Sequence, residues 1–221
     1  ETSAQDTVEE SALITNVLRN SDKEIIEITA FVNGAKKTYK VDEVKFDSVE
    51  KGSTVVLEFD KDNSNVVDDI KSATSSFVAK DLIVESVDSG RREVTFADGK
   101  KARLVSSGLV LNGTDKTDIT TKALSDLRGE NIKVTVLYDE KGSEFAKYFV
   151  YEKITKAEYD RLKGEQTKDE VSKVVALIDA LPTAAKITLS NEKAVEDARK
   201  AYNALTSSQK DRVSKASVEK L

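Results

Sequence analysis

Apolar and polar residues alternate through the first two thirds of the chain, and this period of two predicts β-strands. The clearest runs are residues 25–32 and 37–41, which flank the dipeptide Asn33-Gly34. An Asn-Gly pair between alternating runs favours a tight hairpin, because a type I′ turn needs positive φ at both central residues. With further strands on either side of this hairpin, residues 11–73 are predicted to form a first β-unit of about five strands.

Residues 74–153 repeat this plan and are predicted to form a second β-unit. The first unit contains the strand Val-Val-Leu-Glu-Phe-Asp at residues 55–60, and the second contains Val-Thr-Val-Leu-Tyr-Asp at residues 134–139. Each of these strands follows a glycine and runs into a polar turn. We expect both units to be small antiparallel barrels or sandwiches, and tandem copies of this kind are typical of spacer and adhesive arrays.

Two registers align the second unit with the first. In one, Asp98-Gly99 corresponds to Asn33-Gly34 and an insertion follows; in the other, Asn112-Gly113 corresponds to it at a constant offset. We favour the insertion, because residues 121–127 have the pattern of a helical turn within a loop.

Beyond Tyr151 the apolar period changes from two to about 3.6, which predicts a helical module over residues 154–221. The helix starts are expected at Thr155, Thr167, Ser190 and Thr206. All but Ser190 fit a capping box, in which the hydroxyl and a Glu or Gln three residues later satisfy the first backbone amides. Pro182 is expected to end the first long helix.

The segment after Thr206 carries too few apolar residues for a full third helix, so we expect a partial three-helix bundle, cut from a longer chain. At the other end, residues 1–10 are polar, lack periodicity and are expected to form a linker. Because residue 1 is Glu, we interpret the sequence as a processed chain or a fragment.

The composition excludes several classes of protein. The net charge is −5, from 35 basic and 40 acidic residues, whereas a nucleic-acid binder needs a net basic face. Cysteine and histidine are both absent, which removes disulfides, thiolate metal sites and every catalytic arrangement that uses either residue. No apolar run approaches the roughly 20 residues that a membrane-spanning helix needs.

The helical segment carries a series of linked motifs. They read Val174-x-x-Leu177-Ile178-x-Ala180-Leu181-Pro182, then Ile187-Thr188-Leu189, then Val195-x-x-Ala198-Arg199-x-Ala201-Tyr202-x-x-Leu205-Thr206-x-x-Gln209-Lys210-x-x-Val213. This pattern, over about residues 168–221, resembles the three-helix modules of Gram-positive cell-surface proteins, including S-layer proteins. The two β-units are similar to the short barrel-like repeats that accompany such modules. One departure is that the further apolar helix of the family is missing.

The resemblance implies a structural, non-enzymatic segment of an exported surface protein, located outside the cell in the cell wall or S-layer. Such a segment would act as a spacer and self-assembly module between self-contained cores, with short linkers near residues 72–76 and 151–155. Its partners would be other copies, neighbouring domains or cell-wall polymer, without nucleic acid or membrane insertion. The alternative is an adhesin or a wall-polysaccharide binding module. We assign no catalytic, cofactor-binding or metal-binding residue and expect no cofactor; surface calcium is compatible with the resemblance but is given no site.

Two kinds of acidic motif are candidates for chemistry. Asp60-x-Asp62-x-Ser64 has the oxygen spacing of a calcium loop, but Asn65 and Lys71 stand where an EF-hand has glycine and glutamate, so a solvated hairpin turn is the better interpretation. The carboxylates Asp68-Asp69 and Glu9-Glu10 could in principle hydrolyse a glycoside, but they have no aromatic neighbours to form a sugar platform.

Other patterns have ordinary explanations. Ser-x-x-Lys occurs at Ser190/Lys193, Ser207/Lys210 and Ser217/Lys220, where helix capping accounts for it. The basic pairs Lys36-Lys37, Arg91-Arg92 and Lys100-Lys101 could contact an anionic polymer, but we favour a role in discouraging strand aggregation. Asn112-Gly113-Thr114 fits a glycosylation sequon, and a turn is the preferred interpretation.

Overall fold

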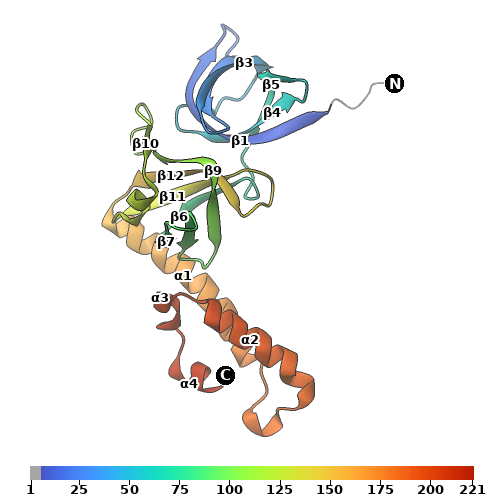
Figure 1. Ribbon diagram of the computed structural model, residues 1–221, viewed down its shortest axis with the longest axis vertical. Helices are drawn as coiled ribbons and strands as arrows, with labels where there is room; N and C mark the ends of the chain where they lie inside the picture. The colour runs from blue at the N-terminus through green and yellow to red at the C-terminus, as the bar shows by residue number, and fades with distance from the viewer. Residues whose placement is uncertain (1–5) are drawn as a thin grey trace.

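The computed structural model describes residues 6–221, in which a β-rich part precedes the helices (Figure 1). The predicted linker over residues 1–10 lies partly outside the described residues. Its last four residues are not a linker, because strand β1 already begins at Thr7 and pairs with a strand of the first unit.

The first unit is a closed barrel with the strand order β1-β2-β3-β5-β4. Its long first strand serves two neighbours: up to Leu13 it pairs with β4, and from Leu13 onward it pairs with β2, with a register shift at Thr15. Contrary to the expected all-antiparallel unit, β3 and β5 pair in parallel. The strands are β1 (Thr7–Arg19), β2 (Ile25–Phe31), β3 (Lys36–Val44), β4 (Thr54–Asp60) and β5 (Asn63–Ser72).

The second unit is a curled sheet with the order β6-β11-β12-β9-β8-β7, and β10 pairs with β9. Only Ile83 separates the edge strands β6 and β7, so they correspond to the two halves of β1. This sheet also contains one parallel pair, β9 with β12. The strands are β6 (Val78–Leu82), β7 (Val84–Asp88), β8 (Glu93–Phe96), β9 (Lys101–Asn112), β10 (Thr120–Lys122), β11 (Ile132–Tyr138) and β12 (Phe145–Lys153).

The insertion register is confirmed. Asp98-Gly99 joins β8 to β9 as Asn33-Gly34 joins β2 to β3, and both glycines have positive φ. The additional residues lie between β9 and β11, where they form β10 and the 3₁₀ helix η1 (Leu124–Arg128). Leu127 of this helix is fully buried, so the insertion contributes to the core of the second unit.

The helical module contains two long helices and two short ones. Helix α1 (Lys156–Asp179) and helix α2 (Glu192–Ala204) pack through Val171, Val174 and Ile178 of α1 and Ala198 of α2. The short helices α3 (Ser207–Lys210) and α4 (Lys215–Glu219) take the place of a third long helix, so a three-helix bundle is not confirmed. The 3₁₀ helices η2 (Ala184–Lys186) and η3 (Leu189–Asn191) lie between α1 and α2.

Two of the four predicted helix starts are confirmed. The hydroxyls of Thr155 and Thr206 each accept a hydrogen bond from the backbone amide three residues later. Thr167 is not a cap, because α1 continues through it and its hydroxyl donates to the carbonyl of Lys163 at 2.6 Å. Ser190 is not one either, because it lies in η3 and Asn191 precedes α2.

The three parts follow one another along the long axis of the molecule, with the barrel at one end, the curled sheet in the middle and the helices at the other end (Figure 1). Helix α1 runs from beside the sheet into the helical part and so connects the two. Within residues 6–221, no helix is both long and apolar enough to cross a bilayer.

Candidate functional site

A buried apolar cluster joins the barrel to the second unit. Leu13, Phe31 and Val56 of the barrel pack against side chains of the second unit in one continuous core. We call this cluster, together with its polar contacts, the inter-unit interface. Its members from the second unit are Phe77, Val78, Leu111, Leu137, Tyr148 and Val150.

The strands at this interface are buried on both faces. In β4, Val55 and Leu57 point into the barrel core, whereas Val56 between them lies in the inter-unit interface. Strand β12 behaves in the same way: Phe149 faces the core of the second unit, and Tyr148 faces the barrel. Successive side chains of a strand point to opposite faces, so a strand between two cores must be apolar at consecutive positions.

Polar groups cross the interface as well. The hydroxyl of Ser11 donates to the carbonyl of Tyr138 at 2.7 Å. The backbone amide of Gly34 donates to the Tyr148 hydroxyl at 2.6 Å, and the Tyr148 ring meets the Phe31 ring edge to face, with centroids 5.8 Å apart. Burial raises the pKa of Tyr148 to about 12, against a smaller lowering by the amide of Gly34. These contacts fix the orientation of the two units, since hydrogen bonds need defined geometry.

Lys147 is the charged residue at this interface. Its ammonium group lies 2.8 Å from Oε2 of Glu10 and 3.2 Å from Oδ1 of Asn33, and only 7% of its side chain is exposed. Burial lowers the pKa of Lys147, and the neighbouring Glu10 partly opposes this effect. The ion pair therefore connects the second unit to the barrel within a largely dry environment.

The expectation of self-contained cores joined by linkers is wrong at both predicted linkers. Ala73 packs against the inter-unit core, and Ile154 packs against Ile83, Ala97 and Leu162, which connect the second unit to α1. The sequence does carry a signal for burial on both faces, because triplets such as Ala12-Leu13-Ile14 and Val55-Val56-Leu57 do not alternate.

A second contact holds the helical module to the second unit. The side chain of Gln166 accepts from the amide of Ile83 at 2.9 Å and donates to the carbonyl of Asp81 at 2.6 Å. The fully buried Gln209 donates to the carbonyl of Ala97 at 2.6 Å. Both glutamines bond the backbone of the sheet, so the position of the helices is specified by geometry as well as by apolar packing.

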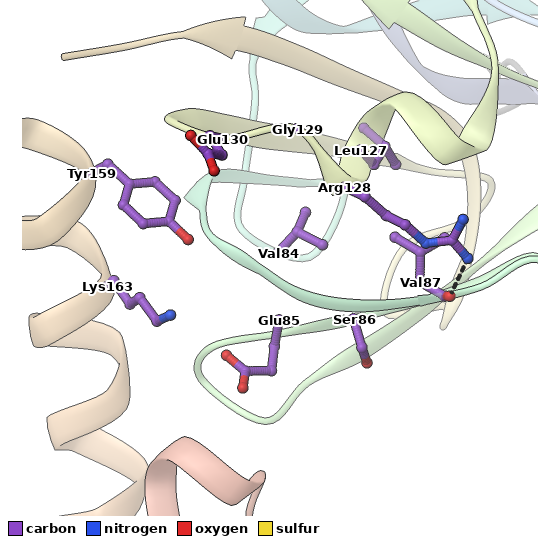
Figure 2. A pocket seen from close by; sticks show the side chains of 10 residues that line it. All are labelled: Val84, Glu85, Ser86, Val87, Leu127, Arg128, Gly129, Glu130, Tyr159 and Lys163. Carbon is purple, nitrogen blue, oxygen red and sulfur yellow. Dashed lines mark hydrogen bonds between the residues drawn. The ribbon is translucent and has the colours of Figure 1, made fainter. Parts of the chain in front are cut away.

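An open groove of about 500 Å³ lies between β7, η1 and α1 (Figure 2). Tyr159 and Lys163 of α1 face it from one side, and the Lys163 ammonium lies 5.9 Å from the Tyr159 ring centroid. Across the groove, Arg128 donates to the carbonyl of Val87 at 2.9 Å. Glu85 and Glu130 add carboxylates to the lining. An aromatic ring, carboxylates and an ammonium group can bind hydroxyl-rich or charged ligands, but this lining contains no nucleophile paired with a base.

The acidic sequence motifs form ordinary turns and strands. Oδ1 of Asp60 accepts from the amide of Asp62 at 2.8 Å, which is a hairpin turn of the Asx type. Asp68 and Asp69 are neighbours in β5, and burial raises the pKa of Asp68. In the part of the chain that the structure describes, no group of three or more acidic side chains is arranged to hold a metal ion.

The basic pairs make local contacts. Arg92 donates to the carbonyls of Val105 and Gly108, so its guanidinium is used within the second unit. Lys101 forms an ion pair with Glu93 at 3.8 Å, and Lys37 donates to the side chain of Asn65 at 2.8 Å. Arg92, Lys101 and Lys37 therefore each have a partner within their own unit.

The sequon and the Ser-x-x-Lys pairs also form hydrogen bonds with nearby residues. Oδ1 of Asn112 accepts from the amide of Thr114 at 3.0 Å, which confirms the turn interpretation of the sequon. In the Ser-x-x-Lys pairs, Lys193 bonds Asp197 at 2.9 Å and Lys210 bonds the carbonyl of Asn203 at 3.2 Å, so neither lysine is directed to its serine.

No protein-family model matches this chain, and no curated protein matches it. The resemblance to Gram-positive surface proteins therefore stays a hypothesis. The chain's own residues define two buried contacts, one between the barrel and the second unit and one between the second unit and the helices.

Proposed function

We propose that this chain is a structural, non-enzymatic segment of an exported, S-layer-type bacterial surface protein, where it acts as a spacer and self-assembly module. The observation that carries the proposal is the inter-unit interface, through which the barrel and the second unit share a buried core. A spacer must keep its length, and a shared core prevents the units from rotating freely about residues 72–76.

The free energy gained by burying apolar side chains at the inter-unit interface supports this role. Full burial of a large apolar side chain contributes about 1.5–3 kcal/mol, and the barrel alone contributes Leu13, Phe31 and Val56 to the interface. Separation of the units would expose these side chains together with those of the second unit. The free energy of the contact is therefore large relative to thermal energy, which is about 0.6 kcal/mol.

The contact between α1 and the second unit extends the same arrangement to the third part. Leu162 is buried with Ile83 and Ala97, and Gln166 and Gln209 bond the backbone of the sheet. Three parts in line, each held to the next by a buried contact, favour a rod over a flexible string. The lack of histidine and cysteine in the sequence supports a non-enzymatic role.

Small-angle X-ray scattering would test the rigid spacer. We expect the scattering curve to fit a single elongated body, with the maximum dimension unchanged by ionic strength. Sedimentation over a range of protein concentrations, with and without purified cell wall, would test self-assembly. A curve that requires an ensemble of bent forms at neutral pH would contradict the spacer role.

A second candidate is binding of cell-wall polysaccharide, which the groove of Figure 2 favours because Tyr159 offers a ring face beside Lys163 and Glu130. We expect Tyr159→Ala to reduce retention on purified cell wall if this groove binds glycan. Phe145→Ala is the matched control, since Phe145 is an aromatic residue on the surface away from the groove lining. Equal retention of the two variants and the unmodified chain would exclude the groove.

A further inference from the structure

We propose that Lys147 and Asn33 react to form an isopeptide bond, which joins the second unit to the barrel covalently, with Glu10 as the catalytic group. The proposal goes beyond the spacer role and does not depend on it, because the buried apolar core holds the two units together with or without this bond. It rests on side chains from three separate segments of the chain, which meet at the Lys147 nitrogen.

A β-bulge directs Lys147 toward the barrel. In β12, Ala146 and Tyr148 pair with consecutive residues of β11, so Lys147 between them has no partner of its own. The pairing with β9 shifts at the same place. A bulge re-aims the side chain of the extra residue, and here the ammonium group reaches out of its own unit to Glu10 in β1 and Asn33 in the turn after β2.

The contacts of the Lys147 nitrogen fit the needs of amide formation. Nζ lies 3.2 Å from Oδ1 of Asn33, and the electrophilic carbon of the carboxamide is joined to this oxygen by a bond of about 1.2 Å. The terminal torsion of an asparagine side chain is broad, so a rotation can turn this carbon toward the amine. Oε2 of Glu10 lies 2.8 Å from the same nitrogen, where a carboxylate can accept its protons.

Burial favours the reactive form of this lysine. Only 7% of the Lys147 side chain is exposed. This burial lowers the pKa of Lys147, and Glu10 and Asp139 only partly oppose the effect. By contrast, hydrogen bonds to Glu58 and Glu9 raise the pKa of Lys71, whose side chain is 42% exposed. The neutral amine is the nucleophile, so Lys147 supplies more of it at neutral pH than Lys71 does.

The carboxamide is held in place, and ammonia can leave from it. Asn33 is exposed, in the turn that joins β2 to β3. The amide of the next residue, Gly34, donates to the Tyr148 hydroxyl at 2.6 Å, which holds this turn against the strand that carries Lys147. Well-oriented pairs of reactants reach effective concentrations of about 10⁵–10⁸ M. An amine held in this way can compete with water for the carboxamide.

The reaction balances without a co-reactant. Glu10 removes a proton from the Lys147 ammonium, and the amine attacks Cγ of Asn33, so that a carbon–nitrogen bond forms and one electron pair of the carbonyl moves to Oδ1. The carbonyl then re-forms, and the bond from Cγ to the side-chain nitrogen of Asn33 breaks. Two lysine protons pass through Glu10 to that nitrogen, which leaves as one ammonium ion. Glu10 ends as the carboxylate that it was, and nothing is oxidised or reduced.

Mass spectrometry tests the bond directly. We would measure the intact mass of the denatured chain and then map its tryptic peptides. We expect a mass lower by one ammonia than the mass calculated from the sequence. We also expect a branched peptide in which residues 24–36 are joined to residues 142–153. The full calculated mass would overturn the proposal. So would an ammonia loss confined to residues 24–36, because that product is a cyclic imide of Asn33 with Gly34.

Three variants assign the roles. Glu10→Gln keeps the size of the side chain but removes the proton acceptor, so we expect the full mass calculated for that variant. Lys147→Arg keeps the positive charge without a nucleophile, since a guanidinium stays protonated, and we expect the full mass again. Lys71→Arg is the matched control, because Lys71 contacts the carboxylates of Glu9 and Glu58 instead of a carboxamide. We expect this control to lose ammonia as the unmodified chain does.

The outcomes separate the bond from the spacer. A branched peptide in Glu10→Gln would overturn the catalytic role of Glu10. If the branched peptide is absent from the unmodified chain while scattering fits a single elongated body, the bond is wrong and the spacer role stands. If the branched peptide is present while scattering requires bent forms, the bond stands and the spacer role is wrong.

Discussion

The hydroxyl of Tyr148 accepts a hydrogen bond from the backbone amide of Gly34 at 2.6 Å, although 114 residues separate the two along the chain. Gly34 belongs to a hairpin turn of the barrel, and Tyr148 belongs to the last strand of the second unit. A turn that local sequence specifies is thus also a contact surface for a distant strand. The inter-unit interface therefore depends on a hairpin turn that both reverses the chain and contacts the second unit.

Removal of the Tyr148 hydroxyl tests this bond. Tyr148→Phe leaves the Gly34 amide without its acceptor in a part-buried place, so we expect the free energy of unfolding to fall by about 0.5–1.5 kcal/mol. Urea denaturation would measure the change. Tyr151→Phe is the matched control, because Tyr151 lies in the same strand and its hydroxyl has no hydrogen bond to the described residues. An equal loss in both variants would contradict a specific role for the bond.

The steric fit at Gly34 gives a second prediction. Gly34 has a φ of +82°, and a Cβ atom there would lie 3.1 Å from the carbonyl oxygen of Ser107 in the second unit. Gly142 has a similar φ of +76° but open space around the equivalent atom. An alanine at either position carries a backbone penalty of about 1 kcal/mol.

We therefore expect Gly34→Ala to destabilise the chain more than Gly142→Ala, as measured by the shift in the denaturation midpoint. The difference between the two variants isolates the contact with Ser107 from the backbone penalty. Gly34 amide exchange should be faster in the first variant alone. Identical midpoints would mean that the second unit moves away from the turn without cost.

The acid-base behaviour of Tyr148 gives a third prediction. Burial raises its pKa to about 12, whereas an unfolded tyrosine titrates near 10, so the folded state holds the phenol proton more tightly. Its contribution to stability is complete below about pH 10 and is lost as the pH rises toward about 12. We expect the free energy of unfolding to fall less steeply with pH above about pH 10 in Tyr148→Phe than in the unmodified chain. Parallel slopes would contradict the buried, neutral state of this phenol.

Local sequence was sufficient to predict the hairpins and some of the caps. Asn33-Gly34 and Asp98-Gly99 both turn the chain with the glycine at positive φ, but Asn33 and Asp98 do not have positive φ, so the predicted type I′ geometry is wrong; Thr155 caps α1 as predicted. Turn and cap geometry depends on a few adjacent residues, so it can be recognised without knowledge of the rest of the fold.

The failure at Thr167 has a physical cause. Thr167 and Glu170 match the capping box, but neighbouring residues bind α1 to two partners: Leu162 packs on the second unit and Val171 packs on α2. Packing on both sides keeps the helix continuous, and the Thr167 hydroxyl then bonds the carbonyl of Lys163 within it. Tertiary contacts decided between two local states, and no single-segment pattern contains that information.

The inter-unit interface was missed for a related reason. Lys147 reads as a surface residue within an apolar run, and its partner Glu10 lies in a segment that looks like a linker. Their contact at 2.8 Å depends on a bulge in β12 and on the docking of the barrel, which are both long-range features. The stretch Phe-Ala-Lys-Tyr-Phe-Val-Tyr at residues 145–151 does indicate burial on both faces. A strand with one face in solvent would alternate apolar and polar residues, and this stretch does not.

The last prediction concerns Gln209, which is fully buried at the contact between the helical module and the second unit. Its Oε1 accepts from the amide of Thr206 at 2.8 Å, and its Nε2 donates to the carbonyl of Ala97 at 2.6 Å. Gln209→Ala removes both bonds and leaves the Ala97 carbonyl unsatisfied, so we expect a loss of about 2–4 kcal/mol in the free energy of unfolding. The same variant should loosen α3 and speed trypsin cleavage after Lys210 and Arg212.

Ser208→Ala is the control for this variant. Ser208 neighbours Gln209 and bonds Glu85 at 3.1 Å, but in a part-buried place, so we expect its removal to cost less than about 1 kcal/mol. If Gln209 holds the helical module in place, tryptic cleavage should accelerate in Gln209→Ala and not in Ser208→Ala. Equal cleavage of both variants would mean that apolar packing of Leu162 against Ile83 is sufficient to hold the helices, because that contact is left intact in each case.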